Sequence, residues 1–474
     1  DSRVGIAIAV GVGIILFSTL MVGLAPPLKF DTLVYHLALP RIYLQEGRMQ
    51  YIPWLFYWGM PQITEMLYTW ALSLAGEGAA IVFGWLIGLI ALLGLYGYVK
   101  QLIGSKAAWV AIGSLLAGFT TAASLAWGYV SWMSILYGLT FLVSIDTWVL
   151  TSDIRYLILT GVFAGLALGV KYTNGILLII GIAYIIWLQW KTTVREMLLS
   201  LFRFIGVTFL TFLPWLVKNF VATGNPAYPF FFPAGMVSPV RLSMYQNQIP
   251  WGDWRDIVFL PFRATMYGLE GGVGYSASIG PLLLVLGGLA WFGWRFRTDV
   301  QRIKIKLLLF VVFVGMVVWA MLARFSGFLI QTRLYFVIFP AFVVLAGAGF
   351  NALKYLKIPE IRIHRIISIL VLLVLSLNIF NILTTTLEQG APQNVLSLQS
   401  DQDYLVNNLG WNALVMEEIS DLPSGTRVLM LWEPRSLYCN PKCFPDETLD
   451  RWYRDLHQLQ SPQAVLESWQ SAGY

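Results

Sequence analysis

The sequence predicts an all-α polytopic membrane protein that carries a small α/β domain at its C-terminus. Of its 474 residues, 58% are hydrophobic and only 12% are charged, a composition far too apolar for a soluble domain. The apolar residues gather in runs that are long enough to cross a bilayer as helices. Only the segment after residue 386 departs from this composition, which is why we expect a separate domain there.

Eleven apolar runs predict about eleven transmembrane helices. The first extends from Val4 to Leu24 and ends just before the pair Pro26-Pro27. Each of the others is close to the length that a spanning helix needs. They lie at about 79–99, 107–123, 126–149, 156–170, 174–190, 201–217, 279–294, 307–323, 333–352 and 366–385.

The basic residues between these runs predict the topology. If the spans simply alternate, the linkers rich in lysine and arginine all fall on one side, and the positive-inside rule makes that side the cytoplasm. The N-terminus is then cytoplasmic, while the loops at 26–78 and 218–278 and the C-terminal segment face outward. Because the net charge of +6 is explained by these linkers, we expect no nucleic acid partner.

The first outer loop contains two candidate surface helices. The second starts at Pro61, a residue suited to a first helical turn, and continues to Gly76. Its apolar residues, such as Met66 and Trp70, share one face, whereas Glu65 lies on another. This pattern is typical of a helix that lies in the membrane interface.

The chain therefore divides into a transmembrane domain at 1–386 and an outward α/β domain at 387–474. The second part has twelve acids against five bases, helical patterns at about 401–419, 446–457 and 462–470, and a strand-like segment at 428–432. The chain begins without a methionine, and Gly473 at its end is a residue that normally leads into a further element. We therefore expect a processed chain that natively continues past Tyr474.

Asp31 is the first candidate for chemistry, because it follows the first span directly. An aspartate in front of an amphipathic run is a favoured helix N-cap, so a purely structural role is one interpretation. The other is a general base that deprotonates an acceptor hydroxyl at the membrane surface. Tyr35 lies one turn later on the same face, and His36 follows it in the same loop.

Several cations could meet a phosphate on the same outer side. Lys171 lies in a tight outer turn, where a lysine runs against the positive-inside bias, so both snorkelling and anion binding remain open. Lys218 begins the second large outer loop, and Arg333 lies at the outer start of the tenth span. Arg41 could bind a lipid phosphate, although a surface arginine needs no such role. Nearby polar or aromatic residues complete a candidate substrate pocket: Asn219, Tyr228 and Tyr335.

The remaining signals are few. No nucleotide-binding or HExxH motif occurs, and three scattered histidines cannot build a histidine-rich metal site. Cys439 and Cys443 flank a proline in the outward segment, which favours a disulfide over two free thiols.

Five segments carry a likeness to a known family. They are DTLVYHLALPRIYL at Asp31, PQITEML at Pro61, GLALGVKYTNG around Lys171, WLVKNF with TGNPAYPF around Lys218, and QTRLYFVIFP around Arg333. Together they resemble the C-type glycosyltransferase superfamily, in particular its bacterial glycosyltransferase-like branch. The likeness runs through most of residues 1–350.

This resemblance implies that the protein transfers a sugar from a polyprenyl-phosphate carrier to a glycan, lipid or protein acceptor on the outer face of the bacterial inner membrane. It implies Asp31 as the base, Glu65 as a second acid near the site, and Lys171, Lys218 and Arg333 as ligands of the donor phosphate. Many members have two adjacent acids where this chain has Asp31 and Thr32, so a divalent metal is the less favoured alternative. We expect an inverting enzyme without a cofactor. The rival hypotheses are a non-catalytic scaffold that retains the fold and a flippase for the lipid carrier.

Overall fold

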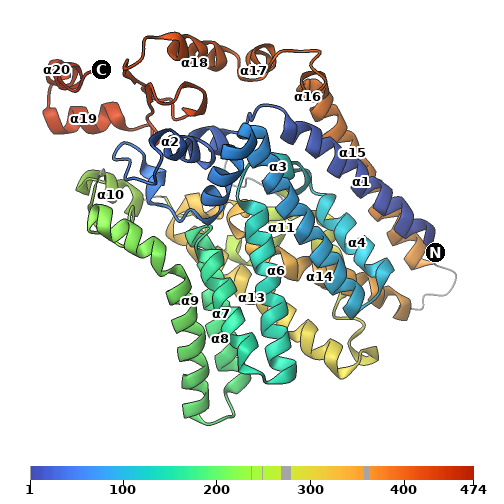
Figure 1. Cartoon of the computed structure of the whole chain (residues 1–474). Coiled ribbons are helices and arrows are strands. Elements are labelled where there is room, and N and C mark those ends of the chain that lie inside the picture. Colours follow the sequence, from blue (N-terminus) through green and yellow to red (C-terminus); the bar gives the residue numbers. More distant parts are fainter. Residues whose placement is uncertain (1, 236, 248, 268–278, 357–361) are drawn as a thin grey trace.

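The computed structural model describes residues 2–235, 237–247, 249–267, 279–356 and 362–474. Long helices form a bundle, and α2 and α17 to α20 lie across one end of it (Figure 1). The turn between α8 and α9 lies at the opposite end (Figure 1). The bundle helices are α1 (Ser2–Leu24), α3 (Ile63–Leu102), α4 (Ser105–Leu116), α5 (Phe119–Ala123), α6 (Ser131–Thr151), α7 (Ile154–Leu168), α8 (Ile176–Gln189), α9 (Val194–Thr223), α12 (Pro281–Leu289), α13 (Asp299–Phe325), α14 (Phe339–Ala352) and α15 (Ile363–Glu388).

The loops and the C-terminal segment supply shorter elements. Those of the loops are the π-helical turn η1 (Thr32–His36), α2 (Ala38–Glu46), the 3-10 turns η2 (Phe56–Gly59), η4 (Tyr172–Gly175) and η7 (Thr332–Ile338), α10 (Pro239–Gln246) and α11 (Trp254–Tyr267). Those of the C-terminal segment are α16 (Ala391–Val395), α17 (Asp401–Leu409), α18 (Trp411–Asp421), β1 (Val428–Leu429), β2 (Cys443–Phe444), α19 (Arg451–Leu459) and α20 (Pro462–Ser471).

The predicted polytopic all-α architecture is confirmed. Each of the eleven predicted apolar runs coincides with a helix of the bundle, and eight of the described helices are long and apolar enough to cross a membrane. The remaining runs are less regular. The pair α4 and α5 is bent by 91°, α7 has 15 residues, and α12 has 9. The chain is therefore a multi-pass membrane protein whose spans include broken and short helices.

The predicted surface helix and the second span are two parts of α3, separated by a kink. Ala75 and Gly76 leave the helical conformation, and Gly76 has a φ of 74°, which suits a glycine. In the first part, Trp70 and Leu74 are exposed, whereas Glu65 is buried. The apolar face of this part therefore looks outward and its polar face looks into the protein, so Glu65 is available to an internal site.

The centre of the bundle is α14. All of its residues except Asn351 are buried, and it packs against α3, α4, α6, α12 and α13. The first and last spans, α1 and α15, lie side by side at the edge of the bundle (Figure 1). Since η7 leads directly into α14, this rigid core also positions Arg333.

The crossing of α6 and η7 depends on Gly138, and we predict that Gly138→Ala destabilises the protein. A Cβ atom on Gly138 would lie 1.9 Å from the backbone oxygen of Val337, which cannot move without shifting η7. Overpacking of this kind costs about 1–3 kcal/mol. Thermal unfolding in detergent should show a clear drop in Tm. The matched control is Gly97→Ala in α3, where a Cβ meets nothing within 4 Å. Its Tm should be unchanged or slightly higher, and an equal loss in both variants would contradict the packing argument.

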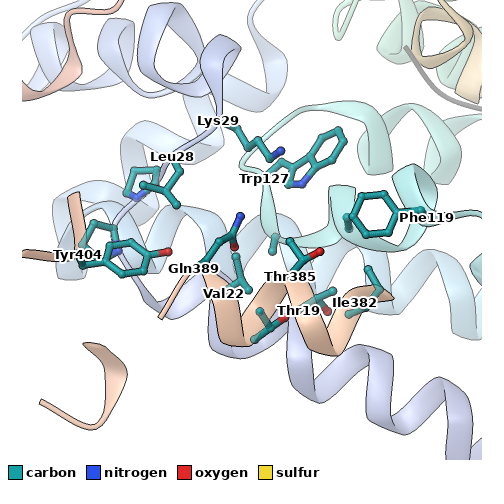
Figure 2. Close-up of a pocket in the computed structure, with 15 residues that line it drawn as sticks. Thr19, Val22, Leu28, Lys29, Phe119, Trp127, Ile382, Thr385, Gln389 and Tyr404 are labelled. Carbon is teal, nitrogen blue, oxygen red and sulfur yellow. The ribbon is translucent and has the colours of Figure 1, made fainter. Parts of the chain in front are cut away.

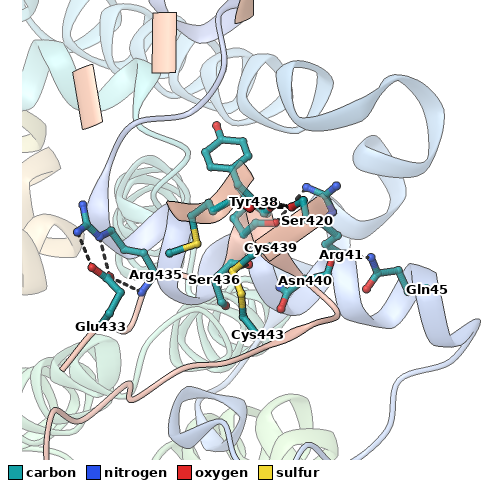
Figure 3. The surroundings of a disulfide bond; sticks show 12 residues. Arg41, Gln45, Ser420, Glu433, Arg435, Ser436, Tyr438, Cys439, Asn440 and Cys443 are labelled. Carbon is teal, nitrogen blue, oxygen red and sulfur yellow. Dashed lines mark hydrogen bonds and ion pairs between the residues drawn. A yellow bond between two sulfur atoms is a disulfide. The ribbon is translucent and has the colours of Figure 1, made fainter. Parts of the chain in front are cut away.

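The C-terminal segment packs against the first loop. The Ser436 amide donates to the Leu33 carbonyl at 3.1 Å, and the Tyr438 hydroxyl donates to the Pro27 carbonyl at 2.7 Å. Its sheet is smaller than predicted: β1 has only two residues and pairs in parallel with β2. Cys439 and Cys443 form a disulfide at the start of β2 (Figure 3). The segment therefore braces the loop that carries Asp31.

Candidate active site

Asp31 is not held by a capping interaction. Its side chain makes no hydrogen bond to the start of η1, and its carboxylate forms an ion pair with the Arg333 guanidinium. Its backbone amide donates to the Tyr129 hydroxyl at 3.3 Å. The local geometry therefore argues against the helix cap, and the ion pair joins the first loop to η7.

Arg333 is oriented from three sides. Besides Asp31, its Nε donates to the Gln331 side-chain oxygen at 3.1 Å, and its guanidinium lies 5.3 Å from the centre of the Tyr129 ring. The side chains of Asp31 and Arg333 are 18% and 21% exposed, so the pair remains accessible to a ligand. An arginine held in this way presents a fixed array of donors, the geometry that phosphate and carboxylate groups require.

Lys171 lies next to this pair and has no counterion of its own. Its ammonium makes no hydrogen bond and no ion pair with any residue in the described ranges, yet it interacts electrostatically with Arg333, Asp31 and Glu65. Burial, together with the smaller effect of the Arg333 charge, lowers its pKa to about 8, and the two acids oppose this shift. The neighbouring Thr173 hydroxyl donates to the Leu334 carbonyl at 3.0 Å, which ties this turn to η7.

Besides the Asp31–Arg333 pair, the site contains a second pair, His36 and Glu65, next to Tyr35. His36 Nδ1 and Glu65 Oε1 are 2.7 Å apart, and both side chains are almost fully buried. Among the described residues, neither His36 Nε2 nor Glu65 Oε2 has a hydrogen-bond partner. Buried polar atoms are normally paired, so these two atoms are available to a bound molecule.

Tyr35 connects the two pairs. Its ring lies 4.1 Å from that of His36 and stacks on Tyr57 at 4.4 Å. Burial raises the pKa of its hydroxyl, and the charge of Asp31 raises it further. The phenol therefore stays protonated and can only donate or accept hydrogen bonds. The site thus contains Asp31, Arg333, Lys171, Tyr35, His36 and Glu65, all of which the sequence had suggested.

Three other predicted residues, Lys218, Asn219 and the fully buried Tyr228, lie in the contacts between the loops. The Lys218 ammonium donates to the carbonyls of Trp58 and Met60 and lies 4.0 Å from the centre of the Trp58 ring. The Asn219 amide donates to the carbonyls of Gly59 and Tyr228 at 2.8 and 2.9 Å. These contacts bind η2 to the loop after α9, so Lys218 and Asn219 position Tyr57 indirectly.

Two further predicted residues are also engaged elsewhere. Arg41 pairs with Glu77 at 3.0 Å and donates to the Leu437 carbonyl at 3.1 Å, at the face where the C-terminal segment docks (Figure 3). The fully buried Tyr335 stacks on Trp319 and donates to the Leu329 carbonyl at 2.7 Å. The contacts that the structure gives them stabilise the fold.

Sequence reasoning missed Tyr129, which contacts both Asp31 and Arg333. It lies in the segment Trp127-Gly128-Tyr129 between two spans, where Gly128 adopts a φ of 68°. A Cβ on Gly128 would lie 3.1 Å from Thr32, so this close approach favours glycine. A glycine beside aromatic residues in a short outer turn was the available signal.

Metal binding finds little support in the side chains. In the part of the chain that the structure describes, no three His, Cys, Asp or Glu residues gather in a group that could hold an ion. The site provides the Glu65 and His36 pair, with one free atom on each. The absence of a cofactor stays a prediction.

An apolar pocket lies behind the site, between α1 and α15 (Figure 2). Lys29 and Trp127 are at one end of it, and the Lys29 ammonium lies 4.6 Å from the centre of the Trp127 ring. The backbone oxygen of Trp127 accepts a hydrogen bond from Thr32, so the pocket and η1 share a wall. None of the predicted site residues lines it.

Comparison with known proteins agrees with this picture. Residues 65–217 match the family model of dolichyl-phosphate-mannose-protein mannosyltransferases, a stretch shorter than half of the chain. It contains Glu65 and Lys171, while Asp31 and Arg333 lie outside it. No curated protein matches the chain in sequence.

Solved structures give a more extensive match. ArnT from Cupriavidus metallidurans bound to undecaprenyl phosphate is similar with a TM-score of 0.55 and 14% identity, over 93% of this chain and 85% of that one. The apo state of the same ArnT gives a TM-score of 0.54 and 15% identity, over 92% and 84%. The chain therefore has the same polytopic membrane fold as these ArnT structures, and the resemblance seen in the sequence is confirmed at the level of the fold.

Proposed function

We propose that this protein is a lipid-phosphate-dependent glycosyltransferase, which moves a sugar from a polyprenyl-phosphate donor to a hydroxyl of a glycan, lipid or protein acceptor. The observation that carries the proposal is the Asp31–Arg333 ion pair with the unpaired Lys171 beside it. This group offers one base and two cations at a partly exposed position. The solved ArnT structure with undecaprenyl phosphate supports such a donor.

Charge favours a phosphate leaving group at this position. The donor is a phosphodiester with one negative charge, and the departing polyprenyl phosphate gains a second as the bond to the sugar breaks. Arg333 already faces one carboxylate, so Lys171 is the cation in excess. Cations aimed at the charge that develops lower the barrier more than they stabilise the bound donor.

Asp31 is the base in this reaction. The acceptor hydroxyl oxygen attacks the anomeric carbon of the sugar, its proton passes to the Asp31 carboxylate, and the phosphate leaves with the electron pair of the broken bond. A single displacement of this kind inverts the anomeric carbon. Arg333 holds the carboxylate in a fixed orientation through their ion pair, while the free atoms of His36 and Glu65 can hold sugar or acceptor hydroxyls.

We further propose the orientation that the basic linkers suggest. The site and the C-terminal segment 387–474 then face the extracytoplasmic side of a bacterial inner membrane, with the N-terminus in the cytoplasm. The transmembrane unit ends near residue 386, within the last turn of α15. Two side-chain cations supply the positive charge, so the proposed reaction requires no divalent metal.

The test is a donor-cleavage assay. The purified protein in lipid nanodiscs is given undecaprenyl-phosphate monosaccharides together with a cell-envelope extract as acceptor, and release of undecaprenyl phosphate is followed by mass spectrometry. Release that depends on both protein and extract, and that survives EDTA, is expected. A scaffold would give no release with any donor. A flippase would give none either, but would move labelled donor between the leaflets of a liposome.

A further inference from the structure

A second cavity, of about 390 Å³, lies away from the candidate active site, where the C-terminal segment meets the outer loops. Its walls come from the loop before η2, from the segment before α10, and from α19 and α20, which lie together at one end of the molecule (Figure 1). This volume is within the range of small-ligand sites. None of the residues that the proposed reaction uses lines it.

The cavity contains a buried arginine without a counterion. Arg451 is only 7% exposed, and within the described ranges no carboxylate forms an ion pair with it. Its Nη2 donates to the Pro445 carbonyl at 3.1 Å, which leaves most of its donors unused. Burial and the nearby Arg454 lower its pKa, while Tyr474, Asp446 and Asp455 oppose the shift without forming an ion pair with it. Buried charges are normally paired, so an arginine in this state favours an anionic ligand.

Aromatic rings form two other walls of the cavity. Trp54 enters from the first loop and Trp469 from α20. The Trp469 indole donates to Asp455 Oδ2 at 2.8 Å, and Asp455 also pairs with Arg454 at 2.8 Å, so the orientation of the ring is held. Flat apolar faces beside planar hydrogen-bonding groups match a sugar ring, which has apolar C–H faces and a polar edge.

We propose that this cavity binds an anionic saccharide, a sugar carrying a carboxylate or a phosphate, with Arg451 on the acidic group and Trp54 and Trp469 on the ring. That this saccharide belongs to the acceptor glycan rests on the proposed function, whereas its binding does not. The short segment from Trp54 to Tyr57 joins the cavity to the active site, since Tyr57 stacks on Tyr35. The Tyr57 amide also donates to Glu447, four residues before Arg451, at 3.1 Å.

Calorimetric titration of the full-length protein in nanodiscs tests the proposal. Three probes are compared: digalacturonic acid, its neutral counterpart galactobiose, and galactose 6-phosphate. At least one acidic probe should bind tenfold or more tightly than galactobiose, and the two acids show whether the site prefers a carboxylate or a phosphate. Equal binding of all three probes, or no binding of either acid, would overturn the proposal.

Single substitutions test whether the acidic probe binds in this cavity. Arg451→Gln should remove the preference for the acid, Arg451→Lys should keep part of it, and Trp469→Ala should weaken every probe that binds. The control Arg435→Gln changes an arginine of the same segment that is paired with Glu433 outside the cavity, and it should bind as wild type. A preference that survives Arg451→Gln would contradict the assignment. Asp31→Asn should bind the acid normally, so a failure of sugar transfer can be told apart from a failure of this site.

Discussion

Asp31→Asn is expected to reduce sugar transfer by about 100-fold to 10,000-fold, the usual contribution of a positioned general base. Asparagine has the shape of aspartate and can still accept a hydrogen bond from Arg333, but it cannot take up the acceptor proton. The rate of undecaprenyl phosphate release in nanodiscs measures the loss. Because the side chain is partly exposed and caps no helix, the folded state should survive the change.

The affinity of Asp31→Asn for undecaprenyl phosphate should not decrease together with the rate. Removing the carboxylate leaves two cations, Arg333 and Lys171, without their nearby anion, so affinity for the phosphate should stay equal or increase. A structural role for Asp31 predicts that rate and affinity are lost together. The matched control is Asp421→Asn at the exposed end of α18, which should alter neither. A near-normal rate in Asp31→Asn would refute the base and favour the scaffold hypothesis.

Much of the membrane architecture was predictable, because each spanning helix corresponds to one continuous apolar run in the sequence. The candidate site was predictable only as a set of residue types on one side. Asp31, Lys171 and Arg333 are separated by more than a hundred residues from one another, and they meet only because the first loop and the η4 turn both contact η7. Nothing in a single sequence specifies that packing.

Lys218 and Arg41 make their contacts apart from the candidate site, and the sequence does not show this for the same physical reason. Lys218 resembles Lys171 in sequence, being a lone cation near the outer end of a span, yet its ammonium is satisfied by two backbone carbonyls of the first loop. Arg41 is likewise satisfied by Glu77 and a carbonyl of the C-terminal segment. A sequence shows where a cation lies along a helix but not whether a distant loop already satisfies its hydrogen bonds.

The orientation of the first part of α3 depends on the surroundings of the helix. Its amphipathic pattern correctly predicted a helix with one apolar side, but periodicity does not state which side the protein buries. In a membrane protein the apolar face can be the exposed one, and here Glu65 points inward to His36 while Trp70 is exposed. This orientation of the helix brings Glu65, a second acid, to the site.

The affinity for undecaprenyl phosphate is expected to fall as the pH rises above about 8, because Lys171 loses its proton there. A lysine is half charged at its pKa and almost fully charged well below it, whereas above it the phosphate binds only after the amine has taken up a proton. The dissociation constant should therefore increase by about tenfold per pH unit above pH 8. The phosphate itself contributes nothing in this window, since its second pKa is about 6.

Two variants separate this mechanism from general effects of pH. Lys171→Arg keeps its charge at every accessible pH, so its affinity should be nearly constant between pH 7 and pH 9.5. Lys171→Ala should bind about 10-fold to 100-fold more weakly than wild type at pH 7, the value of one charge-assisted hydrogen bond, and should converge with wild type at pH 9.5. Lys191→Ala, in the turn at the opposite end of the bundle, should follow the wild-type curve (Figure 1). A wild-type curve that stays flat, or an arginine variant that retains the fall, would remove Lys171 from the phosphate site and leave Arg333 as its principal cation.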